Sequence, residues 1–147
     1  MKKLVPLAAL ACAALMLTAA ASGGSRMTPM MFGATLNAGL ETPHPAGAMT
    51  GASGKFTATV TGKKITWKLR FSHLTGPATA AHIHAGKKGT AGAVLIPLCG
   101  PCKSGASGTG VVTAAQLKML ESGATYVNVH TAKNAGGEIR GQIKGTM

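Results

Sequence analysis

Apolar and polar residues alternate in short runs through most of the chain, and glycine, proline and lysine separate these runs. Ile65, Trp67 and Leu69 alternate with Thr66 and Lys68, which predicts a strand with one buried and one exposed face. The same pattern predicts strands near residues 32–37, 55–61, 65–71, 80–84, 93–97, 109–112, 125–130 and 138–143. Short strands at this spacing favour a β-sandwich or barrel over alternating βα units.

One segment has the pattern of a helix instead. Thr113 and Gln116 have the spacing of a capping box, in which each residue hydrogen-bonds to the backbone of the other. Leu117 and Leu120 then form an apolar stripe, and Gly123 provides a stop signal. We therefore predict an all-β protein with one short helix that packs against the sheet.

The first 21 residues have the pattern of an export signal. Lys2 and Lys3 precede an apolar run, and small residues follow at positions 19–21. The run is too short for an anchored membrane helix, and we expect no transmembrane segment in the mature chain. The expected location is the periplasm or the outside of the cell. Cys12 leaves lipid attachment open as a minor alternative.

Residues 22–31 are small and polar and predict a flexible linker before a single domain over residues 32–147. Removal of the leader lowers the formal charge from +12 to +10. Such a chain favours anionic partners, including anionic polymers of the cell envelope. Nucleic acid is disfavoured because aromatic residues, which could stack on bases, are scarce.

The composition argues against the common enzyme classes. The chain has three side-chain carboxylates, Glu41, Glu121 and Glu138, and no aspartate. It also lacks a Gly-x-Ser-x-Gly nucleophile elbow and a phosphate-binding glycine loop followed by Lys-Ser/Thr. A binding protein is therefore favoured over an enzyme.

Two segments carry a resemblance to a known family. Residues 81–86 read Ala-His-Ile-His-Ala-Gly, and residues 126–131 read Tyr-Val-Asn-Val-His-Thr, followed by Gly-Gly-Glu-Ile-Arg-Gly-Gln at 136–142. In this order they resemble the CHRD domain, named for chordin, over about residues 32–143. The resemblance implies an antiparallel β-sandwich of the immunoglobulin type, with limited similarity to copper/zinc superoxide dismutases, and no established general activity.

Three histidines are the leading candidates for a binding site. Residues i and i+2 of a strand point to the same side, so His82 and His84 can share a ligand, and His130 lies on the corresponding face of its own strand. These strands contain no lysine, although the chain uses lysine and arginine on other exposed strand positions. Asn128, Glu138 and Arg140 are expected on the same outward faces. The alternative is an ordinary polar face in contact with solvent.

Three neutral imidazoles suit zinc or copper. In this hypothesis His82, His84 and His130 bind the metal, Asn128 and Glu138 orient them, and Arg140 pairs with Glu138 or helps to bind an anion. Similarity to superoxide dismutases points to copper, but the absence of aspartate argues against dismutase activity. A metal-free site for a small anion or a sugar remains the second interpretation. Methionines 27, 30, 31 and 49 are further candidates for Cu(I).

Cys99-Gly100-Pro101-Cys102 has the sequence of a thioredoxin redox motif. A glycine-rich stretch follows it, however, where that motif should open a helix. In an oxidising compartment a structural disulfide is the favoured interpretation, with redox activity or metal ligation as alternatives. The function predicted from sequence is thus an exported, non-catalytic CHRD-type protein that binds copper or zinc. The competing functions are an interaction or adhesion domain for anionic ligands and a thiol-disulfide redox protein.

Overall fold

Antiparallel strands account for most of the regular structure in this computed structural model, which describes residues 27–48 and 50–146. The strands are β1 (Met30–Asn37), β2 (Ser53–Thr61), β3 (Lys64–Ser72), β4 (Ala78–Ala85), β5 (Val94–Cys99), β6 (Ala106–Val111), β7 (Thr125–Thr131), β8 (Ile139–Gln142) and β9 (Lys144–Thr146). A 3-10 turn, η1 (Ala38–Leu40), follows β1, and one α-helix, α1 (Ala114–Glu121), precedes β7. The predicted all-β fold with one short helix is confirmed.

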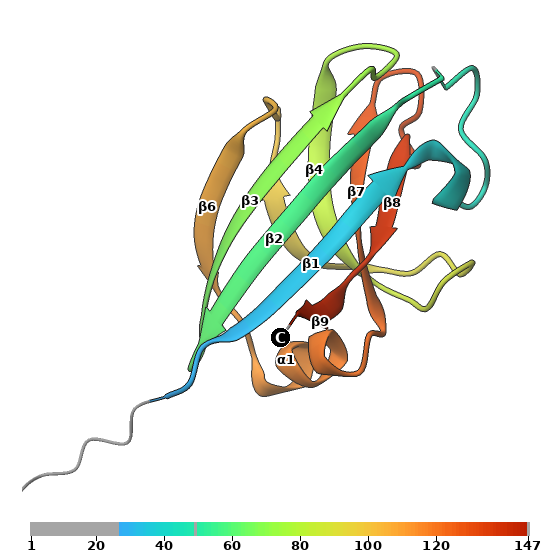
Figure 1. Cartoon of the computed structure of the whole chain (residues 1–147). Coiled ribbons are helices and arrows are strands. Elements are labelled where there is room, and N and C mark those ends of the chain that lie inside the picture. The colour runs from blue at the N-terminus through green and yellow to red at the C-terminus, as the bar shows by residue number, and fades with distance from the viewer. Residues whose placement is uncertain (1–26, 49, 147) are drawn as a thin grey trace, which may run out of the picture.

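The strands form one sheet that curls into two facing layers and nearly closes into a barrel. Its order is β5-β4-β7-β8-β1-β2-β3-β6, and β9 pairs with β1. Figure 1 shows β6, β3, β2 and β1 as one layer, with β4, β7 and β8 behind it. The layers join where Asn37 of β1 pairs with Arg140 of β8. The architecture is that of the predicted antiparallel sandwich.

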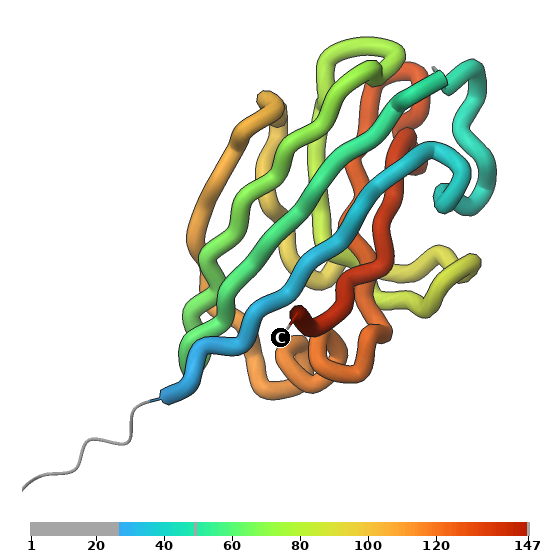
Figure 2. The backbone as a smooth tube through the Cα atoms, viewed as in Figure 1, coloured from blue at the N-terminus to red at the C-terminus, as the bar shows by residue number. Residues whose placement is uncertain are grey.

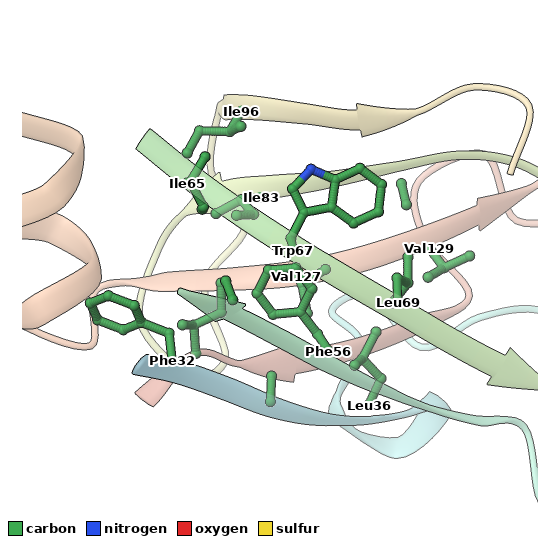
Figure 3. Close-up of a cluster of buried hydrophobic side chains, with 14 of the residues drawn as sticks. Phe32, Leu36, Phe56, Ile65, Trp67, Leu69, Ile83, Ile96, Val127 and Val129 are labelled. Carbon is green, nitrogen blue, oxygen red and sulfur yellow. The ribbon is translucent and has the colours of Figure 1, made fainter. Parts of the chain in front are cut away.

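The core fills the space between the layers. Ile65, Trp67 and Leu69 of β3 are buried, whereas the residues between them are exposed, as their alternation predicted. Figure 3 shows Trp67 between the layers, together with side chains of β2, β4 and β7. Val127 and Val129 of β7 are fully buried on this inner side. The polar residues that alternate with them must therefore lie on the outer side of the sheet.

The helix begins and ends where its sequence signals predicted. The Thr113 side chain accepts a hydrogen bond from the Gln116 backbone, and Gln116 completes the capping box. After the helix, Gly123 has a φ of +68°, a conformation that favours glycine. Leu120 is buried against the core. Helix α1 lies at the end of the barrel near β9 (Figure 2).

Some boundaries differ from the sequence predictions. β1 begins at Met30, within the segment predicted as a linker, because residues 30 and 31 continue the pairing of β1 with β2. The final predicted strand, residues 138–143, corresponds to β8 alone, and β9 is an additional strand after it that pairs with β1. The predicted export signal, Cys12 and Met49 lie outside the described residues. In the described part of the chain, no helix combines the length and hydropathy that crossing a bilayer requires.

Candidate metal centre

Two adjacent strands bring the three predicted histidines together. His82 and His84 lie on β4, and His130 lies on β7, which pairs with β4 through the registers His82↔Asn128 and Ala80↔His130. All three imidazoles therefore occupy the outer side of the same pair of strands. Each offers one ring nitrogen, and these nitrogens all lie within 4.8 Å of one another. His44 and His73 are not part of this cluster.

Backbone carbonyls hold two of the imidazoles in one orientation. Nδ1 of His84 lies 3.0 Å from the carbonyl oxygen of Gly92, and Nδ1 of His130 lies 2.9 Å from that of Ala135. A carbonyl can only accept a hydrogen bond, so both Nδ1 atoms carry the proton and both Nε2 atoms keep a lone pair. A histidine that binds a metal commonly has its second ring nitrogen fixed in this way.

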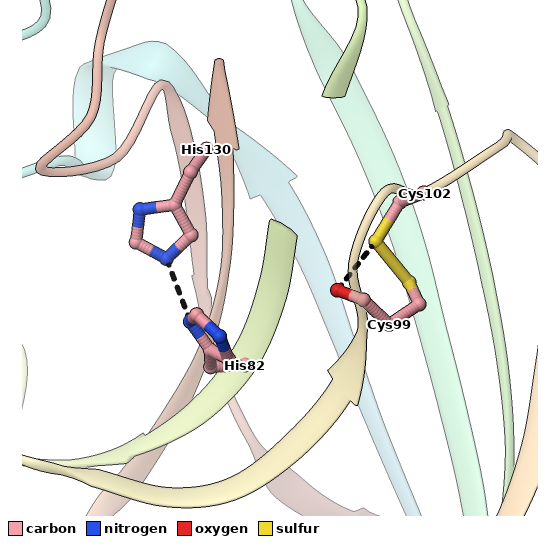
Figure 4. Close-up of a disulfide and its surroundings, with 4 residues drawn as sticks. All are labelled: His82, Cys99, Cys102 and His130. Atoms are coloured by element: carbon pink, nitrogen blue, oxygen red, sulfur yellow. Dashed lines mark hydrogen bonds between the residues drawn. A yellow bond between two sulfur atoms is a disulfide. The ribbon is translucent and has the colours of Figure 1, made fainter. Parts of the chain in front are cut away.

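His82 completes the cluster from its more exposed edge. Its Nδ1 lies 3.0 Å from Nε2 of His130, and Figure 4 shows the two rings directed at each other. Nε2 of His84 is buried and has no hydrogen-bond partner among the described residues. Because Nε2 of His130 keeps its lone pair, Nδ1 of His82 donates the hydrogen bond between them, and a metal ion shared by both nitrogens would have to displace that proton.

Burial keeps two of these imidazoles neutral. It lowers the pKa of His82 below the ordinary 6.5, and the nearby His84 lowers it further. Burial also lowers the pKa of His130, with smaller contributions from His82 and His84, against the raising effect of the hydrogen bond to Ala135. Neutral imidazole is the form that binds a metal ion.

The geometry is close to that of a three-histidine metal site. Ligands about 2.1 Å from a tetrahedral ion lie about 3.4 Å apart, so the 4.8 Å span of the cluster requires only a small contraction. His82 is only half-buried, which leaves a path from solvent. Three protein ligands would leave a fourth position for water or another small ligand.

Most of the outer face of β7 and β8 is covered, in contrast to the alternative interpretation from sequence, and only Gln142 at its end is half-buried. Asn128, Glu138 and Arg140 are each at most 1% exposed. Two loop segments cover these side chains, and the alternation of apolar and polar residues does not predict where loops lie. Glu41, just after η1, accepts a hydrogen bond from Asn128, and Asn134 accepts one from the Ala46 backbone.

The predicted partners of the histidines bind other groups. Asn128 donates to Glu41 Oε2 over 2.8 Å and, more weakly, to the carbonyl of Gly136. Glu138 accepts hydrogen bonds from Thr75, Thr131 and Asn134. Among the described residues, neither Asn128 nor Glu138 shares a hydrogen bond with an imidazole. The groups that orient the histidines are backbone carbonyls, which no side-chain pattern reveals.

Glu138 is the centre of a separate buried network. Burial alone would raise its pKa, but the hydrogen bonds from Thr131, Thr75 and Asn134 outweigh it and lower the pKa below 4.5. Three of these hydrogen bonds, from the backbone and the hydroxyl of Thr75 and from the hydroxyl of Thr131, are 2.6 Å long, as expected for bonds to an ionised carboxylate. The network ties the start of β4 to the turn after β7. Glu138 is therefore an ionised carboxylate with a structural role.

Arg140 stacks on Tyr126 instead of pairing with Glu138. Its guanidinium carbon lies 3.3 Å from the centre of the Tyr126 ring, and its Nη2 donates to the Lys87 carbonyl. On the other ring face, His84 stacks on Tyr126 at 5.0 Å and 10° from parallel. Tyr126 thereby supports one of the three clustered histidines. The sequence motif that contains Tyr126 gave no indication of this role.

Cys99 and Cys102 form a disulfide at the end of β5 (Figure 4). The backbone N–H of Cys102 donates a hydrogen bond to the carbonyl of Ala78 at the start of β4. The chain then continues into β6 without forming a helix after the cysteine pair. A thioredoxin motif would open a helix at this point. The local structure therefore supports the structural interpretation of the cysteine pair.

A comparison with protein families decides the relationship of the chain. The model of the CHRD domain matches residues 32–143, which include all three clustered histidines and every strand except the first two residues of β1 and the whole of β9. The chain belongs to the CHRD family. The CHRD match also contains Cys99, Cys102 and the network around Glu138. Comparisons of this CHRD domain with curated proteins and with solved structures found no match.

Proposed function

We propose that this protein is an exported, non-catalytic CHRD-domain protein that holds one copper or zinc ion through His82, His84 and His130. The observation that carries the proposal is the convergence of three imidazole nitrogens within 4.8 Å, one of them buried and without a partner. A buried polar atom without a partner is costly, and a metal ion would satisfy it. Export, from the signal over residues 1–21, would place the site where metals are scavenged or stored.

The residues favour a transition metal over a hard cation. Imidazole nitrogen suits zinc, copper and nickel, whereas calcium and magnesium prefer oxygen ligands. Glu41 and Glu138, the buried carboxylates, are engaged with Asn128 and with the network around Thr75. Copper(II) binds such sites more tightly than zinc. Because affinity alone does not decide which metal a protein carries in the cell, the metal present will also depend on which ion is available.

The test is the metal content of the purified full-length protein after dialysis, measured by mass spectrometry. We expect about one equivalent of copper or zinc, lost in the double variant His82→Ala/His130→Ala. The matched control is His44→Ala/His73→Ala, which removes two histidines outside the cluster and should retain the metal. If both variants retain the metal, or if the wild-type protein binds none from solutions of either ion, the proposed function is wrong.

Two further measurements check the fold of the histidine variant and the ligands of the metal. Circular dichroism shows whether the histidine variant is folded, and Co²⁺ absorption spectra report nitrogen coordination directly in the wild type.

Sequencing the amino terminus of protein recovered outside the cytoplasm tests export. The expected mature chain begins near Ser22, and an intact Met1 terminus on the exported protein would contradict signal cleavage.

A further inference from the structure

A wide groove lies on the outer face of β1, β2 and β3, and its lining includes none of the three clustered histidines. Its volume is about 1140 Å³, and β8, β9 and the segment after β4 complete its wall. The layer that forms its floor faces the viewer in Figure 1. Gly33 of β1 lines the groove, and its missing side chain leaves the middle of the floor open.

Cations from several elements line the groove. They are Lys55, Lys68, Lys88, Arg140 and Lys144, and the lining contains no carboxylate. The strand registers explain how two of them share one face. Gly33 pairs with Lys144 on one side and with Thr57 on the other, and Thr57 pairs with Lys68. Directly paired residues point to the same side, so Lys144 and Lys68 flank the floor.

The rest of the protein surface does little to neutralise this charge. Of the three side-chain carboxylates in the sequence, Glu41 and Glu138 are at most 4% exposed, and only Glu121 on α1 is exposed. The lysines of the groove are exposed. Arg140 lies near the buried carboxylate of Glu41, but the four lysines have no carboxylate in the groove lining. Such cations in a concavity concentrate anions from solution.

Arg140 provides the second, independent observation. It is 1% exposed, it lines the groove, and its Nη1 has no hydrogen-bond partner among the described residues. A buried guanidinium nitrogen without an acceptor is costly. An anionic oxygen in the groove would supply that acceptor.

The lining also distinguishes between classes of polyanion. Nucleic-acid strands are usually held by aromatic side chains that stack on bases. The aromatic residues of this groove, Phe32 and Phe56, are at most 3% exposed and belong to the core. Threonine hydroxyls stand between the lysines instead, at Thr35, Thr57 and Thr59. Hydroxyl and ammonium groups suit a chain of sugars that carries acidic groups.

We propose that this groove binds an acidic polysaccharide, with Lys68 and Lys144 contacting its acidic groups on either side of Gly33 and Arg140 receiving one of them at the edge. This is a second binding site, independent of the metal centre. It would hold the exported protein on an anionic matrix.

The test compares two labelled probes of equal charge, an oligogalacturonate and an oligodeoxythymidylate, by fluorescence anisotropy with the full-length protein. The groove variant is Lys68→Gln/Lys144→Gln, and the matched control is Lys63→Gln/Lys118→Gln, which removes two exposed lysines outside the groove. Both variants have the same net charge. Thermal denaturation confirms that each is folded.

We expect tighter binding of the oligogalacturonate than of the oligodeoxythymidylate. We also expect roughly tenfold weaker oligogalacturonate binding in the groove variant, since each exposed ion pair contributes modestly, and little change in the control. Equal losses in the two variants would show diffuse charge attraction and overturn the proposal, as would equal or tighter binding of the oligodeoxythymidylate. The variant His82→Ala/His130→Ala should bind the oligogalacturonate normally, which separates this site from the metal proposal.

Discussion

His84 and Tyr126 face each other across β4 and β7, with their rings stacked 5.0 Å apart and 10° from parallel. The stack fixes the plane of an imidazole whose Nδ1 is also held by the Gly92 carbonyl. Tyr126 contacts the same segment a second time, because its hydroxyl accepts a hydrogen bond from the Gly92 backbone at 3.2 Å. One aromatic residue therefore holds both His84 and the backbone that orients His84.

Changes at Tyr126 should separate these two roles. Tyr126→Phe keeps the ring and loses the hydroxyl, so we expect a loss of about 1 kcal/mol in unfolding free energy and near-normal metal affinity. Tyr126→Leu removes the ring, and we expect a larger loss, about 2–4 kcal/mol, with weaker metal binding. Urea denaturation and competition with a chromophoric chelator measure the two effects. Equal metal affinities in the Phe and Leu variants would show that the stack does not support His84.

Metal binding should persist to mildly acidic pH. The pKa values of His82 and His130 are lowered below 6.5 by burial, so both imidazoles remain neutral at pH values where an exposed histidine is half protonated. Zinc affinity should then stay nearly constant as the pH falls to about 6.5 and decrease only below it, where protons compete for the ligands. Chelator competition across this range is the measurement. A decline that begins well above pH 6.5 would contradict the lowered pKa values.

Glu138 should stabilise the fold in a pH-dependent manner. Its pKa is lowered in the folded state, so its contribution is present above the ordinary value of 4.5 and is lost as the pH falls through the folded pKa. We expect Glu138→Gln to cost about 3 kcal/mol at neutral pH, because its buried donors lose a charged acceptor. The difference from the wild type should shrink below pH 4.5. Urea denaturation at several pH values tests this.

Glu41 should show the opposite dependence of stability on pH and therefore serves as a control. Burial raises its pKa above 4.5, against the lowering effects of Thr42, Arg140 and Asn128. The stability that Glu41 gives relative to Glu41→Gln is therefore fully present below pH 4.5 and decreases as the pH rises through its folded pKa. The two variants should show opposite pH trends in the same denaturation experiment. Parallel trends would contradict the assignment of one of the two carboxylates.

Loss of the disulfide should affect stability and leave metal binding intact. A closed loop of this length predicts a loss of about 2 kcal/mol for Cys99→Ser/Cys102→Ser, from the greater freedom of the unfolded chain. The wild-type protein should not reduce insulin, since no helix follows the cysteine pair. Metal content that falls in the serine variant while the fold is retained would instead favour the cysteines as ligands.

Strand alternation predicted an all-β fold and the faces on which the histidines lie, whereas their convergence also required β4 to pair with β7, which the structure shows. Ile83 and Val127 identified the inner face, and this assigned His82, His84 and His130 to the outer one. The cover on that face could not be predicted, because Glu41 reaches Asn128 from 87 residues away and no local pattern encodes this contact. The role of the Gly92 and Ala135 carbonyls in orienting the imidazoles could not be predicted either, because every residue has a backbone carbonyl and no sequence pattern marks the ones that are used.

The burial of Glu41 and Glu138 also governs how copies of this protein meet one another. With those carboxylates inside, the exterior is almost purely cationic, and neighbouring molecules repel within a Debye length of about 10 Å at 0.1 M salt. Attraction to a shared polyanion and repulsion between copies would then act together. Molecules on one polymer should space themselves evenly along it and should not assemble into clusters.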